Sequence, residues 1–202
     1  TRPFFIYMPF IAPHTPLDAP EDLQTKYADM PDERGKSRSK MADNTRFMAK
    51  LTGRDSARPM YAAVVDGMDQ AIGKVLDTLD TEGLADNTIV LFFSDNGGAV
   101  YAIGGADNAP LRGGKGDTFE GGIRVVATVR WPERIPSGSR VDSIISVMDV
   151  LPTLAAAAGV EASTHNRLDG RNMVAALTEA ESIPREELLF FIAESPFKNT
   201  VN

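Results

Sequence analysis

The chain has 202 residues, with 21 lysines and arginines against 28 aspartates and glutamates, and so a formal net charge of −7 at pH 7. It contains no cysteine, which excludes disulfides, thiolate zinc sites and a cysteine nucleophile within these residues. The acidic balance argues against nucleic acid as the main partner. The longest apolar stretch, residues 3–13, is too short to span a bilayer, so we expect no membrane partner.

The first half of the chain contains three patterned segments and one long polar segment. Residues 4–10 are apolar and aromatic and predict a buried strand that leads into a proline-rich loop around His14. Residues 17–58 are polar and irregular, which indicates a long surface insertion with short helices. Apolar residues recur at helical spacing over 59–79 and predict a helix. The β-branched and aromatic run 88–93 predicts a strand buried on both faces.

The second half alternates strand-like and helix-like segments around a glycine-rich stretch at 104–122. The predicted elements are strands over 123–131, 141–147 and 187–192, a helix over 149–158 and a short helix near 172–178. Strands that alternate with helices predict an α/β fold with a mainly parallel sheet flanked by helices. We expect this sheet to be incomplete at its N-terminal side, because the chain enters its first strand almost immediately.

Polar side chains follow two of the predicted strands. In open α/β sheets, ligands bind beyond the carboxyl ends of the strands. Asp95 and Asn96 follow the 88–93 strand and offer hard oxygen donors that suit Ca²⁺ or Mg²⁺. The alternative is an ordinary turn, since Asp-Asn-Gly-Gly is common turn chemistry. His14 follows the first strand and is either a hydrogen-bonding group or general acid for a substrate, or an ordinary loop histidine.

A single lysine, Lys115, lies among the glycines of residues 111–122. Glycines let a backbone approach a ligand closely, and a lysine placed there suits an oxyanion such as sulfate or phosphate. The segment is not a Walker A loop, because Gly116 stands where Ser or Thr should follow the lysine. A flexible surface hairpin is the alternative.

Three aspartates outside these loops are not interpreted as ligands. Asp66 and Asp69 lie on the predicted 59–79 helix, three residues apart on a mostly solvated flank, where a surface role fits better than a ligand pair. Asp149 precedes the predicted 149–158 helix at a position that the helix dipole favours.

Several of these motifs occur together in an order that resembles the type I sulfatases, the arylsulfatase A/B-like branch of the alkaline phosphatase superfamily. The motifs are Ala-Pro-His-Thr-Pro at 12–16, Ser-Asp-Asn-Gly-Gly at 94–98, Leu-Arg-Gly-Gly-Lys-Gly at 111–116, Glu-Gly-Gly-Ile-Arg at 120–124 and Asp-Val-Leu-Pro-Thr at 149–153. The resemblance covers nearly the whole chain. It implies a sulfuric ester hydrolase that cleaves sulfate esters of aryl or sugar alcohols at a divalent-metal site.

The resemblance also implies roles for four residues. Asp95 and Asn96 match ligands of the divalent cation, usually Ca²⁺. Lys115 matches the lysine that binds the sulfate group. His14 matches the histidine that contacts the sulfate ester and assists the leaving group, and a formylglycine made from Cys or Ser is the family's nucleophile.

The nucleophile motif of the family, Cys or Ser followed by x-Pro-x-Arg, is absent from the 202 residues. The chain therefore resembles the C-terminal half of a sulfatase catalytic domain. On this view residues 1–180 are part of that domain, 17–58 are an insertion, and 181–202 begin a truncated C-terminal subdomain. We expect self-association, or a missing N-terminal half that completes the sheet.

Two alternatives remain open at this point. One is a phosphate or phosphonate monoester hydrolase of the same superfamily, and the other is a truncated, non-catalytic fragment. The expected partner is a small-molecule sulfate ester. Composition fits a bacterial periplasmic, secreted or cytoplasmic location about equally.

Overall fold

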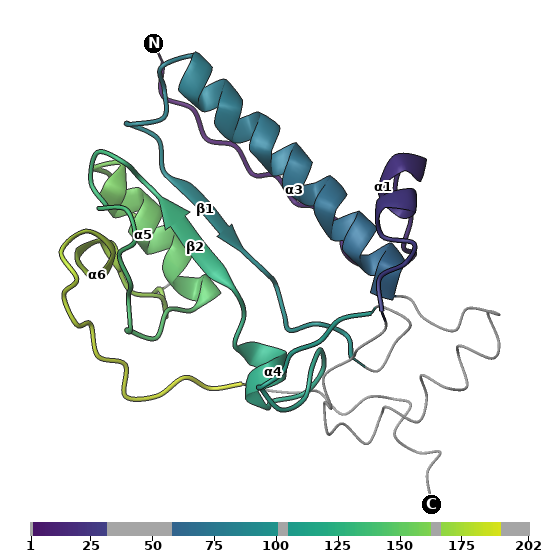
Figure 1. Cartoon of the computed structure of the whole chain (residues 1–202). Coiled ribbons are helices and arrows are strands. Elements are labelled where there is room, and N and C mark those ends of the chain that lie inside the picture. Colours follow the sequence, from purple (N-terminus) through teal and green to yellow (C-terminus); the bar gives the residue numbers. More distant parts are fainter. Residues whose placement is uncertain (1, 32–57, 101–104, 163–166, 191–202) are drawn as a thin grey trace, which may run out of the picture. The chain divides into compact units, whose positions relative to one another are not determined.

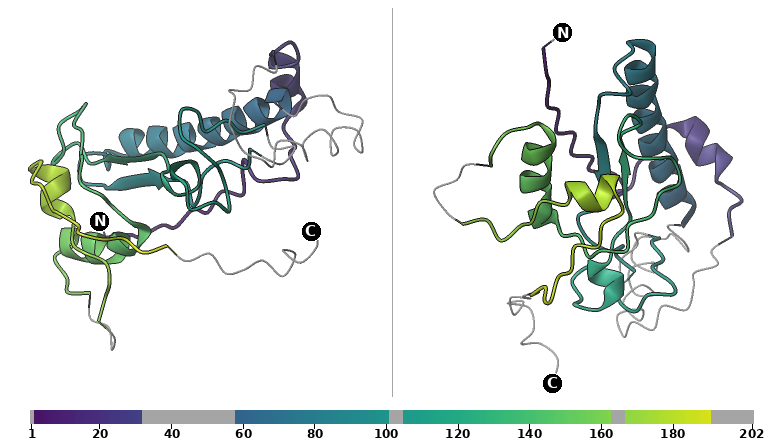
Figure 2. Two further views of the ribbon diagram at one scale, coloured as in Figure 1. Left: turned by 90° about the horizontal axis from the view of Figure 1, so that it is seen from below. Right: turned by 90° about the vertical axis from the view of Figure 1, so that its left-hand side faces the viewer.

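The computed structural model describes residues 2–31, 58–100, 105–162 and 167–190, and Figure 1 shows their helices and strands. The chain divides into two compact units. The first takes its described residues from Thr1–Thr78 and Phe92–Thr128, and the second from Leu79–Leu91 and Val129–Phe190. Figure 2 gives two further views of the same elements.

Helix α3, Arg58–Thr81, confirms the helix predicted over 59–79 and extends it slightly at both ends. The apolar positions that set its period include Val64 and Leu79, which are buried. A short helix, α1 at Glu21–Lys26, belongs to the predicted insertion, of which residues 32–57 lie outside the described part. Within the described part, no helix is both long and apolar enough to cross a bilayer.

Asp66 on α3 joins this helix to α1. Its carboxylate accepts hydrogen bonds from Lys26 Nζ at 2.6 Å and from Tyr27 Oη at 3.0 Å. The hydrogen bond from Lys26 lowers the pKa of Asp66, and the same bond raises the pKa of Lys26. Asp66 is therefore no metal ligand in the described structure, but the solvated surface position expected for it is wrong, because its side chain is only 13% exposed and pairs with Lys26 and Tyr27.

Strands β1, Val90–Phe93, and β2, Ala127–Arg130, are neighbours in a two-stranded sheet. They run in opposite directions in Figure 1, and Ser94 N donates to Val126 O at 3.2 Å beyond their ends. The strand predicted over 88–93 is confirmed in its second part, but its predicted burial on both faces is wrong, because Leu91 is 37% and Phe93 36% exposed. The strand predicted over 123–131 is shorter than expected: Ile123 belongs to α4, Glu120–Ile123, and residues 124–126 form no regular element. The mainly parallel sheet stays a prediction.

The buried strand predicted over residues 4–10 is wrong for the described structure. These residues form no regular element, and among the described strands none pairs with them. A strand gains its stability from a hydrogen-bonded neighbour and from packing on its faces, so apolar composition alone does not produce one. Their large side chains are exposed, with Phe5 at 78% and Tyr7 at 77%.

The second unit contains the 3₁₀ helix η1, Val147–Asp149, followed by helices α5, Val150–Ala157, and α6, Val174–Thr178. Helices α5 and α6 confirm the two predicted there. The strand predicted over 141–147 is wrong, because this segment is irregular and ends in η1. The last predicted strand is not formed over 187–190, and its remaining residues lie outside the described part.

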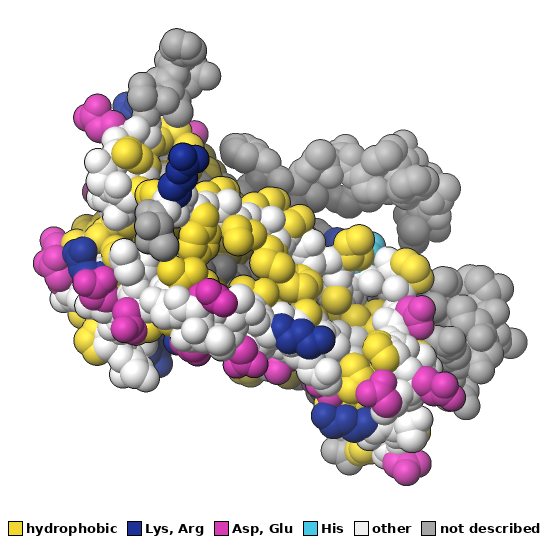
Figure 3. All heavy atoms as spheres, turned by 90° about the horizontal axis from the view of Figure 1, so that it is seen from above, with side chains coloured by type: hydrophobic (Ala, Val, Ile, Leu, Met, Phe, Trp, Pro, Cys, Tyr) yellow, Lys and Arg dark blue, Asp and Glu magenta, His cyan; other side chains and the backbone are white. Residues whose placement is uncertain are grey.

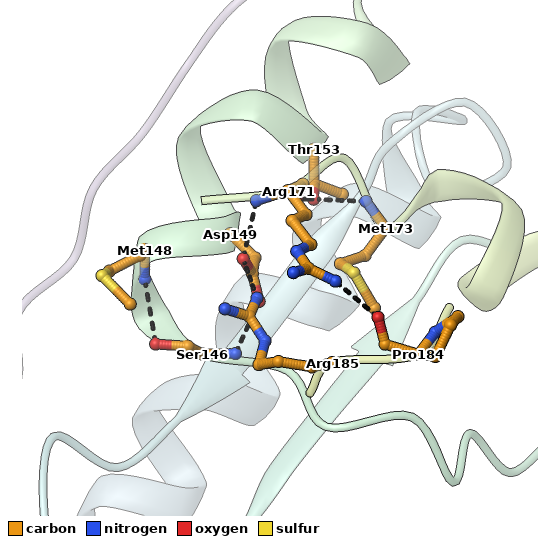
Figure 4. Close-up of polar contacts among 8 residues, drawn as sticks. All are labelled: Ser146, Met148, Asp149, Thr153, Arg171, Met173, Pro184 and Arg185. Carbon is orange, nitrogen blue, oxygen red and sulfur yellow. Dashed lines mark hydrogen bonds and ion pairs between the residues drawn. The ribbon is translucent and has the colours of Figure 1, made fainter. Parts of the chain in front are cut away.

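Asp149 is the buried centre of this unit, with a fully buried side chain. Figure 4 shows that its carboxylate accepts hydrogen bonds from the backbone N–H of Ser146, at 2.7 Å, and of Arg171, at 2.8 Å. Arg185 Nη2 lies 2.5 and 2.7 Å from the two carboxylate oxygens. Asp149 therefore does more than favour a helix N-terminus: it ties three separate segments of the unit together.

Candidate functional site

The loop that follows β1 carries the candidate metal ligands. Ser94 Oγ donates to the carbonyl of Asn96 at 2.8 Å, and Asn96 Nδ2 donates to the carbonyl of Gly97 at 3.0 Å. The side chain of Asp95 is exposed and that of Asn96 is half-buried. These local hydrogen bonds end the strand and turn the chain directly after Asp95, as the Asp-Asn-Gly-Gly sequence predicts.

Glycines allow this loop to pack directly against the segment 112–122. Gly97 N donates to Gly122 O at 2.9 Å. A Cβ built on Gly97 would lie 1.7 Å from Gly121 O, and one built on Gly121 would lie 2.3 Å from Gly113 O. Real Cβ atoms do not approach so closely, so the glycines of both segments are required by contact between backbones.

Lys115 lies in a loop that is tied to the loop after β1. Its backbone N–H donates to Gly98 O at 3.1 Å. The preceding Gly114 N donates to Asp117 Oδ2 at 3.0 Å, and the Arg112 guanidinium lies 3.6 Å from the centroid of the Phe119 ring. These contacts define the backbone around Lys115 and argue against the freely flexible hairpin that the sequence left open.

Sequence reasoning missed one residue at this junction, Asn108. Its side-chain amide makes hydrogen bonds to Gly98 and to Gly113. In the sequence, Asn108 lies in an Asp-Asn-Ala-Pro segment, where the ordinary interpretation is a turn residue. No spacing rule connects a side chain to a backbone ten residues earlier, so no signal in this one sequence identifies the contact.

His14 is exposed and makes local hydrogen bonds. Its backbone N–H donates to Ile11 O at 2.8 Å, and its ring Nδ1 lies 2.6 Å from Thr15 O. The contacts found in the described residues bring the loops of Asp95, Asn96 and Lys115 together, and none of them extends to His14. The second histidine, His165, lies outside the described residues.

The donor set at Asp95 and Asn96 fits part of a Ca²⁺ or Mg²⁺ shell, because carboxylate and amide oxygens are the ligands that hard cations prefer. It does not fit a whole shell, since Ca²⁺ takes about six to eight oxygens. The described ranges also contain no group of three or more histidine, cysteine, aspartate or glutamate side chains that could hold a metal.

Comparisons with known proteins agree with the motifs. A family model described as Sulfatase matches residues 1–160. Steryl-sulfatase of Rattus norvegicus is 44% identical over 136 residues, which make up 64% of this chain and 24% of that protein. Arylsulfatase H of Homo sapiens is 34% identical over 195 residues, which make up 94% of this chain and 30% of that protein.

Among solved structures, the crystal structure of Ps i-CgsB in complex with k-i-k-neocarrahexaose is similar to this chain with a TM-score of 0.66 and 35% sequence identity. The similarity covers 85% of this chain and 32% of that one. The chain therefore spans 24–32% of the length of these proteins.

Proposed function

The chain belongs to the sulfatase family, and from this premise we propose that it supplies part of a catalytic site that hydrolyses sulfate esters. Its solved structural neighbours are sulfatases of the alkaline phosphatase-like fold. The observation that carries the proposal is the hydrogen bond from Lys115 N to Gly98 O, at 3.1 Å. Through it, the loop of the candidate sulfate-binding lysine and the loop of the candidate metal ligands form one structural unit.

Each candidate residue has a role that its chemistry suits. The ammonium group of Lys115 binds the sulfate group and neutralises charge on its oxygens. Asp95 and Asn96 hold a divalent cation, Ca²⁺ or Mg²⁺, which when bound supplies further positive charge to the sulfate. His14 contacts the ester oxygen and gives a proton to the leaving alcohol.

The proposed substrates are sulfate esters of aryl or sugar alcohols. Support comes from relatives named steryl-sulfatase and arylsulfatase H, and from a structural neighbour whose crystals contain k-i-k-neocarrahexaose. The proposed nucleophile is a formylglycine. Because the 202 residues contain no Cys/Ser-x-Pro-x-Arg motif, we propose that another sulfatase segment, an N-terminal half, supplies the nucleophile and the remaining ligands.

The test compares hydrolysis of 4-nitrophenyl sulfate and 4-nitrophenyl phosphate. The purified chain is mixed with an N-terminal sulfatase segment that carries formylglycine, in the presence of Ca²⁺. We expect faster turnover of the sulfate, and a loss of about a hundredfold or more in Lys115→Ala, because a charged donor to the reacting group is removed. Lys74→Ala, at an exposed lysine of α3, is the matched control and should retain full activity.

Two results would contradict the proposal. Preferential turnover of the phosphate ester would favour the alternative phosphate hydrolase. Equal activity of Lys115→Ala and Lys74→Ala would remove Lys115 from the site.

A further inference from the structure

We propose that Asn108 is a positioning residue, which holds the Lys115 loop against the loop that carries Asp95 and Asn96. Its significance for catalysis rests on the proposed function, whereas its structural role does not. Asn108 acts through the backbone of Gly98 and Gly113.

The amide of Asn108 pairs with the backbone of Gly98 as a neighbouring strand would. Its Oδ1 accepts from Gly98 N at 3.0 Å, and its Nδ2 donates to Gly98 O at 3.0 Å. Both backbone polar groups of Gly98 are therefore bonded to one side chain. Because Gly98 follows Asn96 by two residues, this pairing sets the path of the chain directly after the candidate metal ligands.

The same amide group also reaches the Lys115 loop. Its Nδ2 donates a second hydrogen bond, to Gly113 O at 3.1 Å. Gly98 O in turn accepts from Lys115 N at 3.1 Å. One side chain thus bonds directly to the loop of the metal-ligand candidates, directly to the segment before Lys115, and through Gly98 to Lys115 itself.

The fit around Asn108 leaves little freedom. A Cβ built on Gly98 would lie 2.9 Å from Asn108 Oδ1, and one built on Gly114 would lie 3.0 Å from Asn108 Nδ2. The amide of Asn108 therefore fits only because residues 98 and 114 are glycines, since a side chain at either position would collide with it. Both donors and the acceptor of the amide are used, which is nearly the full hydrogen-bonding capacity of an asparagine side chain.

The first part of the test measures amide hydrogen exchange at single residues in the purified chain. In Asn108→Ala we expect exchange at Gly98 and Lys115 to be about tenfold faster or more. The N–H of Gly98 loses its acceptor directly, and the N–H of Lys115 loses the amide that holds its acceptor, Gly98 O, and the segment at Gly113 in place. Exchange in α3 should stay unchanged. Asn172→Ala is the matched control, since Asn172 is an exposed asparagine whose Oδ1 accepts from Val174 N at 2.9 Å.

Asn108→Asp provides a second variant of native size, in case the alanine variant folds poorly. The carboxylate still accepts from Gly98 N, but it has no proton to donate to the carbonyl of Gly98 or of Gly113. Faster exchange at Lys115 in this variant would support the proposal. Exchange at Gly98 and Lys115 that matches the unsubstituted chain in both variants would overturn it.

The second part links the position of Lys115 to its ligand, with inorganic sulfate as the probe in isothermal titration calorimetry. Asn108→Ala carries no added charge, so an affinity for sulfate reduced about tenfold would reflect the lost position of Lys115. An unchanged affinity together with faster exchange would overturn the positioning role. If the unsubstituted chain binds no sulfate even with the N-terminal sulfatase segment present, the proposed function fails at Lys115, while the exchange data still decide the structural role of Asn108.

Discussion

The backbone at Gly97 has no space for a side chain, because the nearest carbonyl oxygen would lie 1.7 Å from its Cβ. We therefore expect Gly97→Ala to lower the free energy of unfolding by about 2 kcal/mol or more, since either the loop or the segment around Gly121 must move. Urea unfolding followed by circular dichroism measures this change.

Gly73 on α3 is the matched control for that substitution. A Cβ built there meets nothing within 4 Å, and alanine favours a helix over glycine by up to about 1 kcal/mol. Gly73→Ala should therefore stabilise the chain. If Gly97→Ala were as stable as Gly73→Ala, the close approach of the two backbones would be refuted.

At the residue scale, the sequence indicates the candidate groups but not what positions them. Asp95 is recognisable because it follows a predicted strand, and Lys115 because it lies among glycines. Both are positions where ligands commonly bind. Asn108 is not recognisable, because its partners are backbone groups, which every residue carries. For the same reason the ion pair of Asp149 with Arg185, 36 residues apart, cannot be predicted from either residue's neighbours.

At the scale of elements, the buried ion pair of Asp149 and Arg185 holds η1 and the start of α5 to the segment around residue 185. The two side chains are 0% and 5% exposed. Arg185→Ala would leave a buried carboxylate without its counter-charge, which typically costs about 3–5 kcal/mol. Thermal unfolding followed by near-ultraviolet circular dichroism is the measurement.

The exposed pair of Arg140 and Asp142 serves as the control, because its side chains are 81% and 80% exposed. Surface pairs contribute about 0–1 kcal/mol, so Arg140→Ala should have little effect. Equal losses of stability in the two arginine variants would contradict the anchoring role of Asp149.

The contact between α1 and α3 should depend on pH. The hydrogen bond with Lys26 lowers the pKa of Asp66 in the folded chain. The carboxylate of Asp66 is therefore protonated less readily in the folded chain than in the unfolded chain. The stabilisation by Asp66 is therefore present at neutral pH and lost as the pH falls below about 4. At neutral pH the unsubstituted chain should melt at a higher temperature than Asp66→Asn. This difference in melting temperature should disappear at acid pH.

Asp69→Asn, at an exposed position of the same helix, is the control and should change the melting temperature little at any pH. A difference between Asp66→Asn and the unsubstituted chain that persisted at acid pH would show that the carboxylate charge is not what stabilises the contact.

Elements with a strong local pattern are the ones that the sequence predicts well. In helix α3 the apolar residues recur at helical spacing over many residues, and the helix forms as predicted. Residues 4–10 have the composition of a strand, but a strand depends on a neighbour that local composition does not supply. The segment 141–147 has the same weakness, and it ends instead in η1, where Ser146 and Asp149 form a capping box.

At the scale of the whole molecule, large apolar side chains are exposed, and Figure 3 shows hydrophobic side chains at the surface. In the first unit they concentrate in one continuous segment, with Phe4, Phe5, Ile6, Tyr7, Met8, Phe10 and Ile11 all between 39% and 80% exposed. Soluble monomers rarely expose contiguous apolar patches of this kind. We therefore propose that this segment is covered by a second copy or by an N-terminal sulfatase segment.

Sedimentation velocity tests this expectation. The purified chain should self-associate with increasing concentration. The double variant Phe5→Ser, Tyr7→Ser should shift the chain toward the monomer, because it removes exposed apolar surface from this segment. Val160→Ser, at a 60% exposed residue outside this segment, is the control. A chain that stays folded and monomeric at all concentrations would contradict a second copy as the covering partner.

The most direct test of the central claim is the chemical reactivity of Lys115. The purified chain, mixed with the N-terminal sulfatase segment, is acetylated in the presence of Ca²⁺, with and without inorganic sulfate, and modification of individual lysines is followed by peptide mass spectrometry. The account predicts that sulfate slows acetylation of Lys115, because an ammonium group bound to an oxyanion is withheld from the reagent, while exposed Lys74 reacts at an unchanged rate. Equal rates at Lys115 with and without sulfate would contradict the assignment of a sulfate site to this chain.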